Sequence, residues 1–131
     1  MADEAVCIET PTKFARYVVA DGTGIAKGTI LKISADPNTA AASAGADIFA
    51  GIATEEKVAS DGKTQIGTAI DGVWDIKCAG SAVTLGHLIA LSGANLIRDS
   101  VEADFPLGAV FGKALETGSA SEVIRVRLGL N

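Results

Sequence analysis

The sequence predicts a small all-β protein, a β-barrel or β-sandwich of about eight to ten short, mainly antiparallel strands. Short apolar runs alternate with polar residues, as strands with one buried face require. Turn-forming glycine, asparagine and aspartate recur at intervals of about 8 to 12 residues, and no helical period is sustained. A third observation is an internal echo, in which a strand-like phrase occurs twice.

The echo has two parts, and their order is kept along the chain. Residues 28–34 (GTILKIS) are matched by residues 86–92 (GHLIALS), 58 positions later. Residues 49–55 (FAGIATE) are matched by residues 110–116 (VFGKALE), 61 positions later. Such self-similarity is typical of a chain built from two related units.

Residues 1–14 predict an extended N-terminal arm, because the alternation at Val6 and Ile8 is brief and Pro11 removes a backbone donor. Two interpretations stay open. The arm adds a strand to the sheet of a neighbouring molecule, or it is a frayed chain end.

Residues 15–131 predict a single β domain. In its first half we expect strands, a loop carrying one helical turn, and a hairpin whose two-residue Asp71-Gly72 link suits a type I′ turn. The strands are expected at residues 15–20, 29–34 and 48–54, the loop at residues 36–46, and the hairpin arms at residues 64–70 and 73–78.

The second half predicts four more strands and ends on the clearest pattern of the chain. Ile124, Val126 and Leu128 alternate there with Arg125 and Arg127, which indicates a strand with one buried and one solvated face. The expected strands span residues 88–91, 96–98, 109–115 and 122–128, with a turn at Ser92-Gly93.

Composition limits both the stability and the partners of the chain. It has 131 residues, of which 48% are hydrophobic but only 5% aromatic, and alanine occurs 23 times. Such a core buries little area per residue, so binding to a partner would add stability.

The formal net charge of −5 argues against direct nucleic-acid binding, and short apolar runs argue against a membrane partner. Without a signal-like N-terminus, synthesis in the cytoplasm is expected.

Reactive residues are sparse, so the sequence predicts no enzyme activity, no metal and no cofactor. His87 is the one histidine, and the sequence offers no partner with which it could form a base–nucleophile pair. Cys7 and Cys78 lack metal-ligand spacing and are expected to be buried thiols. The acidic residues of the arm and loops are expected to serve solubility; they include Asp3, Glu4, Glu55, Glu56, Asp99, Glu102 and Asp104.

Two features could contact a partner. Val6, Cys7 and Ile8 of the arm could pair with a neighbouring sheet. Arg125 and Arg127, with Arg98 nearby, could meet an acidic surface, although an outward arginine pair can also be a solvated strand face that keeps a sheet edge from aggregating.

The chain resembles the head decoration proteins of tailed bacteriophages, also called capsid cement or stabilisation proteins. The likeness covers most residues beyond Phe14 and rests on three stretches. They are residues 28–34 with 48–55, residues 68–74 (TAIDGVW), and residues 112–116 followed by 123–128.

The resemblance implies a non-enzymatic virion protein that binds the outer surface of a capsid, often as a homotrimer, and stabilises the lattice of major capsid protein. Val6, Cys7, Ile8, Arg125 and Arg127 are then the candidate capsid contacts. The alternative is a small β binding module of another assembly, such as a tail component or a carbohydrate-binding domain.

Overall fold

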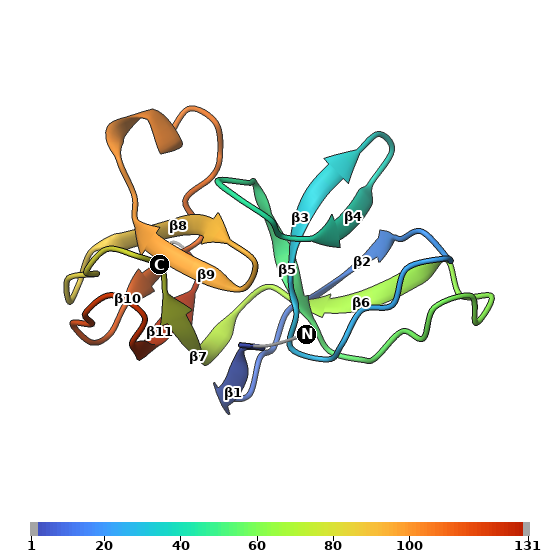
Figure 1. Ribbon diagram of the computed structural model, residues 1–131, viewed down its shortest axis with the longest axis horizontal. Coiled ribbons are helices and arrows are strands. Elements are labelled where there is room, and N and C mark those ends of the chain that lie inside the picture. Colours follow the sequence, from blue (N-terminus) through green and yellow to red (C-terminus); the bar gives the residue numbers. More distant parts are fainter. Residues whose placement is uncertain (1–2, 130–131) are drawn as a thin grey trace.

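The computed structural model describes residues 3–129, so residues 1 and 2 of the predicted arm and residues 130 and 131 of the predicted domain lie outside it. It confirms the all-β class (Figure 1). The elements are β1 (Val6–Glu9), β2 (Phe14–Val18), β3 (Ile30–Ala35), β4 (Thr39–Ala42), β5 (Phe49–Ala53), β6 (Gln65–Ala69), β7 (Gly72–Cys78), β8 (Leu88–Gly93), β9 (Leu96–Asp99), the 3₁₀ turn η1 (Glu102–Asp104), β10 (Gly112–Ala114) and β11 (Val123–Leu128).

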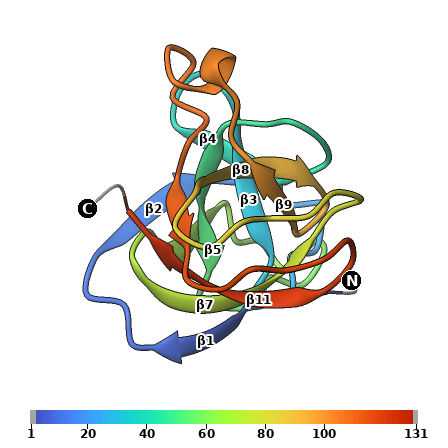
Figure 2. The same ribbon diagram turned by 90° about the vertical axis from the view of Figure 1, so that its left-hand side faces the viewer.

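The strands form two small barrels, which lie side by side in Figure 1 and one in front of the other in Figure 2. The first barrel closes in the order β2-β4-β3-β5-β6. The second has the order β7-β11-β10-β8-β9, and the pairing of β9 with β7 completes the same ring. Strand β1 is added to the outer side of β7. Most pairs are antiparallel, and each barrel has one parallel pair, β2–β4 and β7–β9.

The repeat predicted from the sequence is a structural repeat. Every strand pair of the first barrel has its counterpart in the second. The same holds for loops: the isolated bridge Ile25–Lys57 corresponds to Val83–Gly118, at the spacings of 58 and 61 found in the sequence. The turn glycines Gly28 and Gly86 both have positive φ and each donates its amide to an alanine carbonyl at 2.9 Å. The chain is therefore two copies of one five-stranded unit.

A shared core joins the two barrels. Ile30, Ile52 and Ala69 of the first barrel belong to the same buried cluster as the core of the second, and the rings of Phe49 and Phe111 stack at 4.2 Å across the boundary. Polar groups are matched there too. The buried Asn95 accepts a hydrogen bond from the Ile30 amide through Oδ1 at 2.8 Å.

The expected loop with a helical turn at residues 36–46 is wrong, because this segment contains β4. Strand β4 pairs antiparallel with β3 through a tight turn at Asn38, which has a φ of 46°. A run of small residues has little intrinsic strand preference. Pairing with β3, and with β2 at one position, overrides that local preference.

The expected hairpin across Asp71-Gly72 is also wrong. Strand β6 pairs with β2 and β5, whereas β7 pairs with β1, β9 and β11. The turn is therefore the junction between the barrels. Its glycine, with a φ of 96°, suits the reversal that the sequence predicted, but a turn signal does not fix which strands pair.

Smaller differences concern single residues. The outward and inward alternation of β7 and β11 is confirmed. Strand β10 is shorter than expected, and the turn after β8 falls at Asn95 rather than at Ser92-Gly93. Both cysteines are free thiols, but only Cys78 is buried. Cys7 is exposed because it lies on the added strand β1.

The arm residues of β1 are docked on their own chain, on strand β7. The amide of the buried Ala5 donates to the Gly28 carbonyl at 2.9 Å and fixes the start of β1 between the barrels. Whether the arm also adds to a neighbouring molecule stays a prediction.

A matched pair of glycines tests this seat of β1. A Cβ at Gly28 would lie 2.7 Å from the Ala5 carbonyl oxygen, whereas a Cβ at Gly86 has nothing within 4 Å. Both positions have positive φ, so both alanine variants carry a strain of about 1 kcal/mol. We expect only Gly28→Ala to release β1, seen as faster amide hydrogen exchange at residues 5–9. Equal exchange in the two variants would contradict this seat.

Candidate docking surface

The outer side of β1, β7 and β11 forms one exposed surface, here called the arm face. Its members are Val6, Glu9, Asp75, Lys77, Val123, Arg125 and Arg127, which are exposed or half-buried, whereas Val73 in the same rows is buried. The registers place Val6, Asp75 and Arg125 in one row across the three strands. Candidate contact residues from opposite ends of the sequence therefore lie on one sheet.

Four of the five predicted contact residues belong to this region. Val6, Arg125 and Arg127 lie on the arm face, and Ile8 lies in the bulge of β1 between Cys7 and Glu9. Cys7 does not join them. It is opposite Trp74, on the other side of β1 from the arm face, and is exposed there.

The arm face combines exposed apolar groups with charges of both signs, three basic residues (Lys77, Arg125 and Arg127) and two acidic ones (Glu9 and Asp75). Val6 and Val123 are 57% and 58% exposed. Arg125 is partly balanced by Asp75, with Nε and Oδ1 3.5 Å apart. Arg127 is directly opposite Lys113, a like-charged neighbour, and its buried Nε has no hydrogen-bond partner among residues 3–129. An acidic group from a partner would reduce the repulsion between the charges of Arg127 and Lys113.

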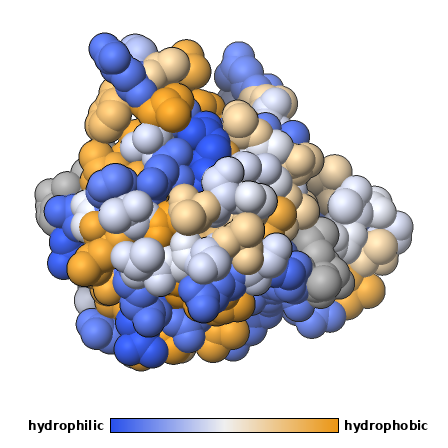
Figure 3. Space-filling model, turned by 60° about the vertical axis from the view of Figure 1, so that its left-hand side comes forward, coloured by the Kyte–Doolittle hydropathy of each residue, from blue (hydrophilic) through white to orange (hydrophobic). Residues whose placement is uncertain are grey.

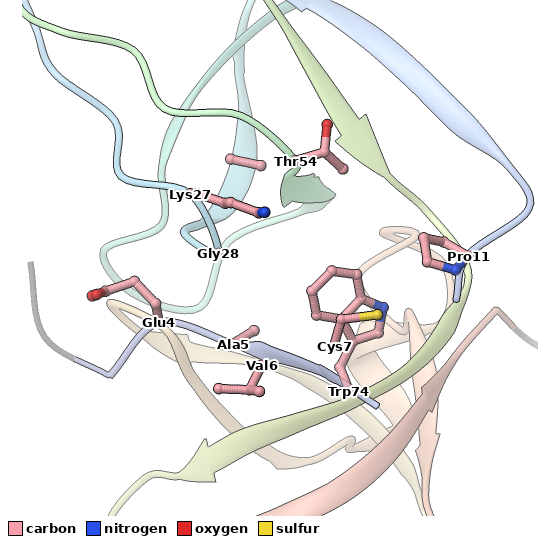
Figure 4. A pocket seen from close by; sticks show the side chains of 10 residues that line it. Glu4, Ala5, Val6, Cys7, Pro11, Lys27, Gly28, Thr54 and Trp74 are labelled. Carbon is pink, nitrogen blue, oxygen red and sulfur yellow. The ribbon is translucent and has the colours of Figure 1, made fainter. Parts of the chain in front are cut away.

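Two open clefts border β1. The first, of about 550 Å³, is lined by apolar groups of Ala5, Cys7, Pro11 and Trp74 with Lys27 on its far side (Figure 4). Cys7 and Lys27 both line it, but the Cys7 Sγ donates to the Glu9 carbonyl at 3.4 Å rather than to Lys27, and the mostly apolar lining suits an apolar side chain. The second, of about 560 Å³, lies between the arm face and the start of β2, with Lys13 and Arg127 on its walls.

Asp71 anchors the linker between β1 and β2. Its carboxylate accepts hydrogen bonds from the Thr12 hydroxyl at 2.7 Å, the Lys13 amide at 2.9 Å and the Thr12 amide at 2.8 Å. These bonds, with the Thr12 hydroxyl first, hold the pKa of Asp71 below its usual value. The linker and the junction between the barrels are therefore tied together.

This anchor should be pH-dependent. A lowered pKa means that ionised Asp71 stabilises the fold above the unfolded pKa of about 3.9, and that this stabilisation is lost as the pH falls through the folded pKa. We expect the NMR amide signals of Thr12 and Lys13 to titrate together with a midpoint below 3.9 and to lose this transition in Asp71→Asn. A midpoint at or above 3.9 would contradict the bonding pattern.

A second exposed apolar surface lies on the loop between β9 and β10, which projects beyond both barrels (Figure 1). Val101, Phe105 and Leu107 of this loop are 57%, 54% and 66% exposed. Figure 3 shows hydrophobic residues among hydrophilic ones on the projecting part of the surface. This loop was not among the contacts predicted from the sequence, although its three large apolar residues lie between polar ones and could have indicated an exposed apolar surface.

The projecting loop is braced by an ion pair. Asp104, only 5% exposed, accepts two hydrogen bonds from Arg98 at 2.8 and 2.9 Å and a third from the Val101 amide. Arg98 is also the main reason why the pKa of Asp104 is lowered. The expected solubility role is therefore wrong for Asp104, because a partner at β9 buries it.

Two further basic groups, His87 and Lys57, lie beside aspartates. His87 Nδ1 is 3.1 Å from Asp99 Oδ2 on the surface. The buried Lys57 is held by Asp21 and Asp61 at 3.1 and 3.0 Å, a structural arrangement. Across the described chain, no three side chains of His, Cys, Asp or Glu gather in a way that could hold a metal ion, and no helix has the length and hydropathy to cross a membrane.

Comparison with solved structures finds a similar fold in the crystal structure of the N base of head fiber gp8.5 from bacteriophage phi29. The TM-score is 0.57, the sequence identity is 15%, and the match covers 89% of this chain and 95% of that one. No protein-family model and no curated protein sequence matches the chain. The two proteins therefore share a fold over nearly their whole lengths.

Proposed function

We propose that this protein is a structural protein of a bacteriophage virion that binds the outer surface of the capsid and stabilises its lattice of major capsid protein. The main support is the fold shared with a head-fiber base over 89% of this chain. The family resemblance of the sequence points to the same role. In this proposal the protein acts by binding alone, without catalysis or cofactor, and its partner is protein rather than nucleic acid or membrane.

The arm face supplies the contact in this proposal. Exposed Val6 and Val123 provide apolar area, and Arg127, opposite Lys113, favours an acidic partner surface. Copies assembled as a homotrimer would bind through several such faces at once, and multivalency turns weak single contacts into tight attachment. The alanine-rich core then gains stability from burial at the interface.

The test mixes purified protein with expanded capsids that lack it. We expect saturable co-sedimentation and a higher disruption temperature of the particles. Absence of both effects would contradict the proposal. Binding to isolated tails instead of capsids would favour the alternative of a tail component, and binding to glycan arrays would favour a carbohydrate-binding domain.

A further inference from the structure

One edge of the first barrel is open where the equivalent edge of the second barrel is covered. Hydrogen bonds from the Val19 amide to Thr64 and from the Ile70 amide to Lys13 fix the ladder between β2 and β6. Strand residues alternate, so the backbone groups of Phe14, Arg16 and Val18 point away from β6. Val18 pairs with Thr39 of β4, which leaves Phe14 and Arg16 at the edge.

The internal repeat identifies what this edge is built to receive. Phe14, Arg16 and Val18 correspond to Val73, Asp75 and Lys77 of β7, because the β2–β6 and β7–β11 registers superimpose. Lys77 pairs with β9 as Val18 pairs with β4. Val73 and Asp75, however, are paired with β1. Among residues 3–129, the first barrel has no counterpart of that added strand.

The unpaired groups at this edge are few and well defined. The Arg16 carbonyl accepts the side-chain amide of Asn38 at 3.0 Å. Within the described chain, the Arg16 amide and both backbone groups of Phe14 have no hydrogen-bond partner. Phe14 is 60% exposed, and the exposed Arg16 makes no ion pair with another described residue. An incoming strand therefore meets an apolar ring and a free positive charge.

We propose that the edge of β2 at Phe14 and Arg16 binds an extended segment of the capsid protein by strand addition, with an acidic side chain near Arg16 and an apolar one near Phe14. Strand addition uses the free backbone groups, and the side chains set the preference. The second cleft lies between this edge and the arm face, because Lys13, the neighbour of Phe14 in the chain, and Arg127 both line it. This inference rests on the proposed function and specifies its partner.

The test follows amide hydrogen exchange of the full protein, free and bound to capsids that lack it. We expect the amides of Phe14 and Arg16 to exchange about tenfold or more slowly in the bound state. Arg16→Glu should weaken binding about tenfold, and Arg16→Lys should largely preserve it. Lys63→Glu, a charge reversal at an exposed lysine on the loop before β6, is the matched control and should bind normally.

The outcomes separate the two proposals. Failure of the unaltered protein to bind capsids would overturn the proposed function. Normal binding with unchanged exchange at Phe14 and Arg16, or with Arg16→Glu equal to Lys63→Glu, would overturn the strand addition alone. Thermal unfolding of each variant checks that its fold is retained.

Discussion

Asn95→Ala is expected to lower the free energy of unfolding by about 2 to 4 kcal/mol. The substitution removes the oxygen that accepts the buried Ile30 amide at 2.8 Å, and an unpaired buried amide costs about 1 to 3 kcal/mol. Alanine at a φ of 60° adds about 1 kcal/mol. Chemical denaturation measures this loss of stability, which we attribute mainly to a weaker contact between the two barrels.

The repeat supplies the control. Asn38 occupies the equivalent turn, with a φ of 46°, but its side chain bonds to the Arg16 carbonyl at an exposed site. Asn38→Ala should therefore cost only about 1 kcal/mol. Equal losses in the two variants would mean that the Asn95 side chain does not join the barrels as described.

Val6→Asp combined with Val123→Asp is expected to weaken capsid binding about 30-fold or more while leaving thermal stability almost unchanged. Both side chains are more than half exposed, so their replacement leaves the core intact. In the complex they would be buried, where a carboxylate without a partner is strongly unfavourable. Quantitative co-sedimentation over a range of protein concentrations measures the effect.

Val58→Asp is the matched control, because Val58 is 60% exposed but lies on a loop of the first barrel away from the arm face. It should bind as the unaltered protein does. If the double variant binds normally and a change of Phe105 and Leu107 to serine abolishes binding, the projecting loop rather than the arm face is the contact.

The sequence was most informative where one face of a strand is buried. The alternation of Ile124, Val126 and Leu128 with two arginines predicted β11 and its exposed face. The echo of residues 28–34 in residues 86–92 predicted the duplication. Both signals come from local patterns that burial imposes directly on the residues concerned.

Strand pairing could not be obtained in the same way. The Asp71-Gly72 turn correctly marks a reversal, but β6 and β7 continue into different barrels because their partners are distant in sequence. Strand β4 has an alanine-rich sequence and forms because β3 and β2 offer backbone partners. Such long-range pairing overrides local preference.

The candidate site was predicted in part. The arm and the arginines were singled out separately, and their meeting on one face depends on β7 lying between β1 and β11. The free edge at Phe14 and Arg16 was not predicted, since it is defined only by comparing two folded barrels. The brace of the projecting loop likewise depends on a contact between Arg98 and Asp104 that spacing alone does not fix.

The most direct test of the account is to find where the protein resides in an infected cell. Mature particles purified by density gradient and digested with protease are compared with intact ones by quantitative mass spectrometry. The account predicts many copies of the protein per intact particle. Protease acting from outside should remove them without opening the capsid. Particles that lack the protein, with all of it free in the lysate, would contradict the account.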